Sequence, residues 1–200
     1  MVRYLFLAIL LSVALPATTS AQKSKMSKAE REAAWRAERL KKREAEKAKI
    51  AAEDSIAFVQ AVEALRSGSW ALEASNITFN NGVTRFVTSS TNYIAVNGGE
   101  GTVQTAFNNT NINSPNGLGG VTLEGNVWGE RMGTDAEGNV FYSCSIQGNG
   151  ISALIYVTLT ANTNQASANV NANYSGNRMT FSGYLYPYNS AGIFEGQPSY

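Results

Sequence analysis

The stretch Ile151–Thr160, ISALIYVTLT, decides the fold because its side chains alternate between two faces. Successive side chains of a β-strand point in opposite directions, so a period of two predicts a strand with one buried face and one wet face. Such alternation is typical of antiparallel sheets. The predicted inner face holds Ile151, Ala153, Ile155, Val157 and Leu159, and the outer face holds Ser152, Leu154, Tyr156, Thr158 and Thr160.

The same period recurs in other parts of the chain, with Asn- and Gly-rich turns between the runs. We expect Ala166, Ala168, Val170, Ala172 and Tyr174 on one inner face, and Met179, Phe181, Gly183 and Leu185 on another. The predicted strands are 70–75, 77–79, 84–89, 92–97, 101–107, 119–127, 128–133, 139–147, 150–160, 165–174 and 177–186. So many short strands suggest a sandwich or a closed barrel. We predict a mainly β fold: an antiparallel meander sheet or barrel of about eight to ten strands, preceded by a long N-terminal α-helix.

The helix is predicted from Lys28 to Arg66, a span without Gly or Pro that is rich in Ala, Glu, Lys and Arg. Ser27-Lys28-Ala29-Glu30 fits a capping box, and Gly68 fits the left-handed position that ends a helix. Its second half carries an apolar stripe of Phe58, Val62 and Leu65, which we expect to dock on the domain that follows. The first half has little to bury. We therefore expect a charged helical stalk at 22–52 and a β-rich domain with the docked helix end at 53–200.

The N-terminus has the layout of a secretory signal peptide. Arg3 precedes an apolar run, and Thr19 and Ala21 stand where small residues precede a cleavage site. The run is shorter than the ~20 apolar residues of a membrane-spanning helix. We expect residues 1–21 to be removed, leaving a periplasmic or secreted protein without a transmembrane segment.

Charge is distributed unevenly along the chain. Segment 23–54 holds eleven basic and seven acidic residues, whereas only three basic residues stand against seven acidic ones beyond Ser67. The basic segment could be a solvated spacer, or it could contact the cell envelope or a partner. Export and the interleaved acids argue against nucleic acid.

Few residues could support catalysis. The chain has no His, and no Lys follows Ser67, so a serine or cysteine nucleophile would lack its usual base. Cys144 is in phase with Val140 and Ile146, which predicts a buried thiol. Glu124 and Glu130 are the carboxylates that a glycosidase would need, but we interpret them as outward-facing charges. We expect a protein that is not an enzyme and has no metal and no cofactor.

The glycine-rich stretch Ser114–Gly125, SPNGLGGVTLEG, is interpreted as a turn that leads into a strand. A phosphate-binding loop would be followed by a helix and would usually carry a Lys. Here an alternating run follows, and no Lys is present.

Aromatic residues are the better candidates for binding. Tyr184, Tyr186 and Tyr188 share a period of two and could form a stripe that contacts a ligand, with Trp128, at the core or rim, as a fourth candidate. The alternative is that the tyrosines are covered by the helix or by the C-terminal tail. Small inward residues, such as Ala166 and Ala168, either leave room for an apolar ligand or let neighbouring elements approach closely.

The order of the segments TNYIAV, PNGLGGVTLEG, QGNGIS and ANVNANYSGNRMTFSGYLYP resembles bacterial domain-of-unknown-function family 4251, over roughly residues 53–195. The resemblance implies an exported protein with a signal peptide, a charged helical lead-in and a β-rich domain. It implies no activity and no catalytic residues.

Two functional hypotheses follow. The first is an exported, non-enzymatic β-rich domain that acts as a periplasmic binding or accessory module for an apolar or lipid-like ligand. The second is a structural or interaction protein of the cell envelope that acts through its charged N-terminal helix. The expected partner is accordingly an apolar small molecule or an envelope component.

Overall fold

The computed structural model describes residues 26–107, 119–173 and 178–196. The expected signal peptide, the first part of the turn at Ser114–Gly125 and inward residue Tyr174 lie outside these ranges. The chain divides into two compact units, Met1–Glu44 and Ala45–Tyr200. Among the described helices, none has the length and apolar character needed to cross a bilayer.

Helix α1 spans Lys28–Ser67 and has the two ends that the sequence predicts. The Ser27 hydroxyl accepts a hydrogen bond from the Glu30 backbone N–H at 3.2 Å, and the Glu30 carboxylate accepts one from the Ser27 N–H at 2.7 Å. Gly68 follows the last turn with φ +64°. Residues 28–53 are exposed. Nearer its C-terminal end, α1 contributes Ala61, Ala64 and Leu65 to the same buried cluster as the interior of the sheet.

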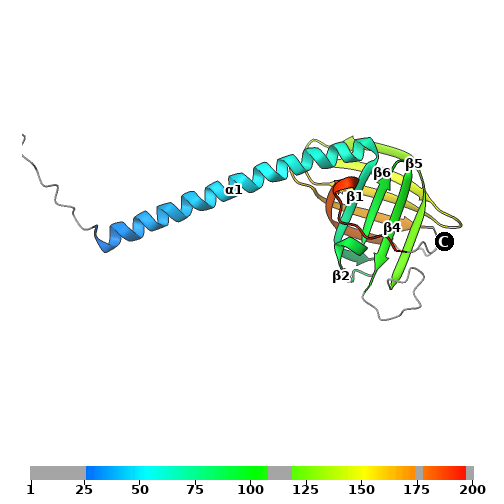
Figure 1. Cartoon of the computed structure of the whole chain (residues 1–200), viewed down its shortest axis with the longest axis horizontal. Coiled ribbons are helices and arrows are strands. Elements are labelled where there is room, and N and C mark those ends of the chain that lie inside the picture. The colour runs from blue at the N-terminus through cyan, green and yellow to red at the C-terminus, as the bar shows by residue number, and fades with distance from the viewer. Residues whose placement is uncertain (1–25, 108–118, 174–177, 197–200) are drawn as a thin grey trace, which may run out of the picture. The chain divides into compact units, whose positions relative to one another are not determined.

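The described residues form one nine-stranded sheet in which every pairing is antiparallel. The strands are β1 (Ser69–Phe79), β2 (Thr84–Phe86), β3 (Tyr93–Asn97), β4 (Glu100–Ala106), β5 (Gly120–Thr134), β6 (Val140–Gln147), β7 (Ser152–Leu159), β8 (Gln165–Ala172) and β9 (Arg178–Pro187). The strand order is β2-β1-β3-β4-β5-β6-β7-β8-β9, and β1 also pairs with β9. That last pairing closes eight strands into a barrel and leaves β2 as an extra strand on β1 (Figure 1). The predicted mainly β, antiparallel barrel with its N-terminal helix is confirmed.

Two predicted strand breaks are wrong, because they are β-bulges within single strands. The register of β1 shifts between Ala74 and Asn76, and that of β5 shifts between Trp128 and Arg131. A bulge inserts an extra residue, so the side chains after it change face and the period of two is interrupted. From the sequence, such an interruption looks like the end of one strand and the start of the next.

The predicted inner faces of the later strands are confirmed. Ile155 and Phe181 are fully buried and Val170 is 1% exposed. Cys144 is also buried, as its phase predicted. Trp70 and Tyr142 pack edge to face inside the barrel, with ring centroids 5.3 Å apart. The interior therefore consists of closely packed side chains.

The small inward residues serve close packing. Ala166 and Ala168 are part of the continuous buried cluster. Gly183 lies where β9 approaches β1, and a Cβ added there would come within 1.9 Å of the Glu73 carbonyl oxygen. These small residues therefore let neighbouring elements approach closely, which is the second of the two roles that we considered for them, the first being room for an apolar ligand.

The C-terminal segment covers the outer face of β3 and β4. Gln104 is fully buried there, because its side-chain amide donates to the Phe194 carbonyl at 2.8 Å and accepts from the Gly196 N–H at 2.7 Å. Beside it, Tyr93 is 1% exposed and packs with Tyr188. Both faces of β3 are therefore buried, which explains the continuous burial of Tyr93–Val96.

Replacing Gly183 with alanine should lower the free energy of unfolding by about 1–3 kcal/mol, because the new methyl group would overlap the backbone of β1. Gly133→Ala is the matched control, since a Cβ there meets no atom within 4 Å and should change stability by less than about 1 kcal/mol. Urea unfolding curves of both variants measure the difference. Equal midpoints would contradict the close approach of β9 to β1.

Candidate functional site

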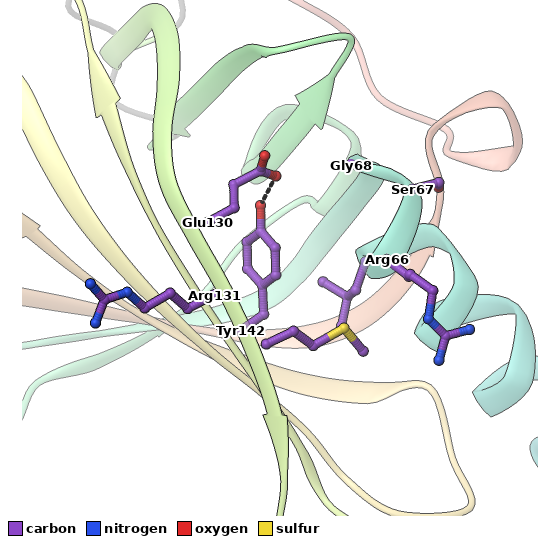
Figure 2. A pocket seen from close by; sticks show the side chains of 8 residues that line it. Arg66, Ser67, Gly68, Glu130, Arg131 and Tyr142 are labelled. Carbon is purple, nitrogen blue, oxygen red and sulfur yellow. Dashed lines mark hydrogen bonds between the residues drawn. The ribbon is translucent and has the colours of Figure 1, made fainter.

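A pocket of about 280 Å³ opens where α1 ends beside the bulge of β5 (Figure 2). We call it the mouth pocket. Its lining residues come from the end of α1 and the glycine that follows it, from β5 and from β6. They are Leu65, Arg66, Ser67, Gly68, Glu130, Arg131, Met132 and Tyr142.

The bulge in β5 sets the chemistry of the mouth pocket. Gly129 has φ +67°, and the residue after it, Glu130, reaches the buried Tyr142. The Tyr142 hydroxyl donates a hydrogen bond of 2.5 Å to the Glu130 carboxylate, and Figure 2 shows the two groups pointing toward each other. Burial, and then this hydrogen bond, raises the pKa of Tyr142. Glu130 is therefore not the simple outward-facing charge that we expected.

Glu124 and Glu130 do not form a carboxylate pair. Glu124 is paired in register with Thr102 and lies next to the buried Leu123, so its side chain is on the outer face. Glu130 contacts Tyr142, an inward residue, from the other face. Burial raises the pKa of Glu124, with smaller contributions from Glu195 and Glu100.

The Cys144 thiol lies behind Tyr142 and is buried. Burial raises the pKa of the Cys144 thiol to about 12, so it stays protonated at neutral pH. In the described ranges, no three His, Cys, Asp or Glu residues come together where they could hold a metal ion.

A second pocket, of about 300 Å³, lies against β5, β6 and β7, and we call it the β5–β7 groove. Six of its nine lining residues lie in two rows on the outer face, Arg131–Ser143–Tyr156 and Gly133–Phe141–Thr158. The other three, Met132, Tyr142 and Val157, are paired in the row between them. The aromatic rings are half exposed, with Phe141 at 44% and Tyr156 at 47%. The groove therefore has two aromatic walls, small residues between them and a guanidinium at one side.

A third row extends this outer face beyond the groove. It consists of Trp128, Ser145 and Leu154, paired in register. Trp128 is 61% exposed, so it is a surface residue and not part of the core. Of the four binding residues that we expected, Trp128 is the one next to the groove.

The three tyrosines are not brought together with Trp128. Tyr184 is 43% exposed on β9, and three strands lie between β9 and β5 in either direction around the barrel. Tyr186 is half-buried, and burial raises its pKa. Tyr188 lies beyond the end of β9, in the short helix η2 (Tyr188–Ser190), and packs over Tyr93. The expected stripe therefore holds only for Tyr184 and Tyr186, because the strand stops at Pro187.

Sequence reasoning missed Arg131, Phe141 and Tyr156 as candidate site residues. One signal was available, since Leu154 and Tyr156 are large side chains on the face of β7 that alternation assigns to water. The position of Arg131 beside them could not be read from the pattern, because it depends on the bulge in β5.

The comparisons with known proteins agree with this fold. The family Domain of unknown function (DUF4251) matches residues 52–185. The chain belongs to this family. It is also similar to a DUF4251 family protein from Bacteroides eggerthii DSM 20697, whose crystal structure was determined at 1.95 Å resolution. The two are 48% identical with a TM-score of 0.63, and the similarity covers 72% of this chain and 96% of the other. No curated protein matches the chain.

Removing the Glu130 carboxylate should leave the buried Tyr142 hydroxyl without its acceptor. We expect Glu130→Ala to lower the free energy of unfolding by about 1–3 kcal/mol. In a Tyr142→Phe background the same change should cost less than about 0.5 kcal/mol, because no hydroxyl is left unpaired. Denaturant unfolding of the four proteins gives the coupling energy.

Glu137→Ala serves as the control for this cycle, because Glu137 is an exposed carboxylate in the turn between β5 and β6. It should show no coupling with Tyr142→Phe. An equal cost for Glu130→Ala in both backgrounds would mean that the hydrogen bond does not stabilise the barrel.

Proposed function

We propose that this protein is an exported, non-enzymatic binding module whose ligand contacts the outer face of the barrel in the β5–β7 groove. The supporting observation is the contrast between the two sides of the sheet. The interior is filled by the protein's own side chains, while the outer face of β5–β7 carries half-exposed aromatic residues around an open pocket.

The filled interior makes a surface site more favourable than an interior one. Leu72, Ile94 and Ile146 are among the side chains with no exposed surface. A lipid-like ligand inside the barrel would have to displace such residues, and protein interiors are packed too tightly to admit one without that rearrangement. This packing supports a binding face on the outside of the strands.

We propose a non-enzymatic role because the chain has few side chains that could act as a catalytic base or nucleophile. The chain has no His, the Cys144 thiol has a raised pKa, and the two candidate carboxylates lie on opposite faces of the sheet. Export is proposed from the signal-peptide pattern of residues 1–21. A rigid sheet that displays aromatic side chains is well suited to binding in such a setting.

The double variant Phe141→Ala/Tyr156→Ala tests the groove. Trp128, one row away, provides a fluorescence signal for ligands added to a Trp35→Phe protein, since Trp70 is fully buried. The panel consists of soluble polysaccharides, peptidoglycan fragments, fatty acids and phospholipid vesicles. We expect at least one class to bind, and the double variant to bind it at least tenfold more weakly.

Tyr184→Ala is the matched control, because Tyr184 is similarly exposed but lies outside the groove, on β9, which β8 separates from β7. It should bind like the parent protein. Binding that survives the double variant, or a lipid that copurifies inside the folded barrel, would reject the groove as the binding site.

A second candidate function is contact with the cell envelope through α1. The observation that favours it is the exposure of residues 28–53, including Trp35 at 56% and Leu40 at 57%. The Arg39 guanidinium lies 4.6 Å from the centre of the Trp35 ring, so this surface is both cationic and aromatic.

Deleting residues 22–49 should then abolish cosedimentation of the protein with envelope fractions while the thermal unfolding of the barrel is retained. The same deletion should leave ligand binding in the β5–β7 groove unchanged. Undiminished cosedimentation of the shortened protein would reject the role of α1.

A further inference from the structure

We infer that the β5–β7 groove binds an acidic carbohydrate, a sugar unit whose carboxylate pairs with Arg131 while its ring lies between Phe141 and Tyr156. The inference rests on the proposed function, because it names the ligand class for the same groove. Three observations support it: the Arg131 guanidinium and the Ser143 and Thr158 hydroxyls have no partner among the described residues, and the groove is small.

Arg131 is a cation without a partner in the described part of the chain. The ion pairs there are Lys49–Glu53 and Arg66–Glu63, and no hydrogen bond involves the Arg131 side chain. Although Arg131 follows Glu130 in sequence, adjacent side chains of a strand point to opposite faces, and in Figure 2 the guanidinium points away from the Glu130–Tyr142 pair. Beyond Ser67 the chain has three basic residues against seven acidic ones, so Arg131 is one of few cations in a mainly acidic part of the chain.

The groove also offers unused hydroxyl groups. Ser143 and Thr158 lie between the aromatic walls, and neither side chain forms a hydrogen bond with the residues that the structure describes. Gly133 leaves open space next to them, since a Cβ there would meet no atom within 4 Å. Sugar hydroxyls can pair with these groups, and the apolar faces of a sugar ring can contact Phe141 and Tyr156.

The shape of the groove is less suited to a lipid or a peptide. A volume of about 300 Å³ is at the small end of the ~300–1,000 Å³ of ligand pockets, which suits one or two sugar rings better than an acyl chain. Along the groove, strands β6 and β7 are each paired on both sides, so a peptide cannot add a strand to either of them. The planar guanidinium suits a carboxylate, because it can donate two parallel hydrogen bonds to it.

The test uses the full mature chain and three families of carboxylated oligosaccharides: oligogalacturonate, alginate and hyaluronan fragments. Isothermal titration calorimetry compares each with its neutral methyl ester, which keeps the ring and removes the charge. We expect at least one acid to bind at least tenfold more tightly than its ester. Arg131→Gln should reduce acid binding to the level of the ester and leave ester binding unchanged.

Two further variants complete the test. Arg131→Lys should restore only part of the preference for the acid, because an ammonium lacks the two-pronged geometry. Arg85→Gln is the matched control, since Arg85 is an exposed arginine on β2, and it should behave like the parent protein. Thermal unfolding of each variant verifies that it remains folded.

Several outcomes would overturn the inference: none of the acids binds, acid and ester bind equally, or Arg131→Gln has no effect. The proposed function is tested separately. If a lipid or peptide binds and Phe141→Ala/Tyr156→Ala abolishes that binding, the carbohydrate inference fails and the groove remains the site. If an acid binds but the double variant retains its affinity, both fail.

Discussion

The pairing of β1 with β9 is the constraint on which the rest of the structure depends. It joins residues Trp70–Phe79 to the antiparallel partners Pro187–Met179 and turns an open meander into a barrel. Closure requires the two backbones to approach closely, which Gly183 permits at the Glu73 carbonyl. Because β1 directly follows α1, the same strand also positions the helix end against the core. Closure gives each of the eight barrel strands a neighbouring strand on both sides and surrounds a packed core.

The bulge in β5 gives two neighbouring charges different roles. Without the bulge, adjacent residues would still point to opposite faces, but each residue after Trp128 would face the other way. Glu130 would then point outward and Arg131 inward. With it, Glu130 faces the barrel end and accepts the hydrogen bond of the buried Tyr142, while Arg131 faces outward beside Ser143 and Tyr156. One inserted residue thus satisfies a buried hydroxyl and places a guanidinium in the β5–β7 groove. Bulges are common where a strand must re-aim a side chain in this way.

The binding face proposed here is built on β6 and β7, which are paired on both sides, and on the half of β5 that pairs with β6. A side chain on such a strand is positioned by the register of its neighbours, which favours recognition of a rigid ligand such as a sugar ring. The C-terminal segment covers another part of the outer surface through Gln104 and Tyr93, so not every outward face is available. The charged part of α1 lies largely before the family match at 52–185, which is consistent with a separate role for it.

The sequence by itself determined the local structure. Capping residues placed the start of α1 at Lys28, alternation identified the inner faces that hold Ile155 and Phe181, and the phase of Cys144 predicted its burial. These features depend on residues a few positions apart, where propensity and periodicity act. Only the tertiary structure decided that the sheet closes, that two apparent strand breaks are bulges, and that Arg131, Phe141 and Tyr156 share a groove while Tyr188 does not join Tyr184. Those outcomes depend on register between strands as far apart in sequence as β1 and β9, and a local pattern carries no information about such pairing.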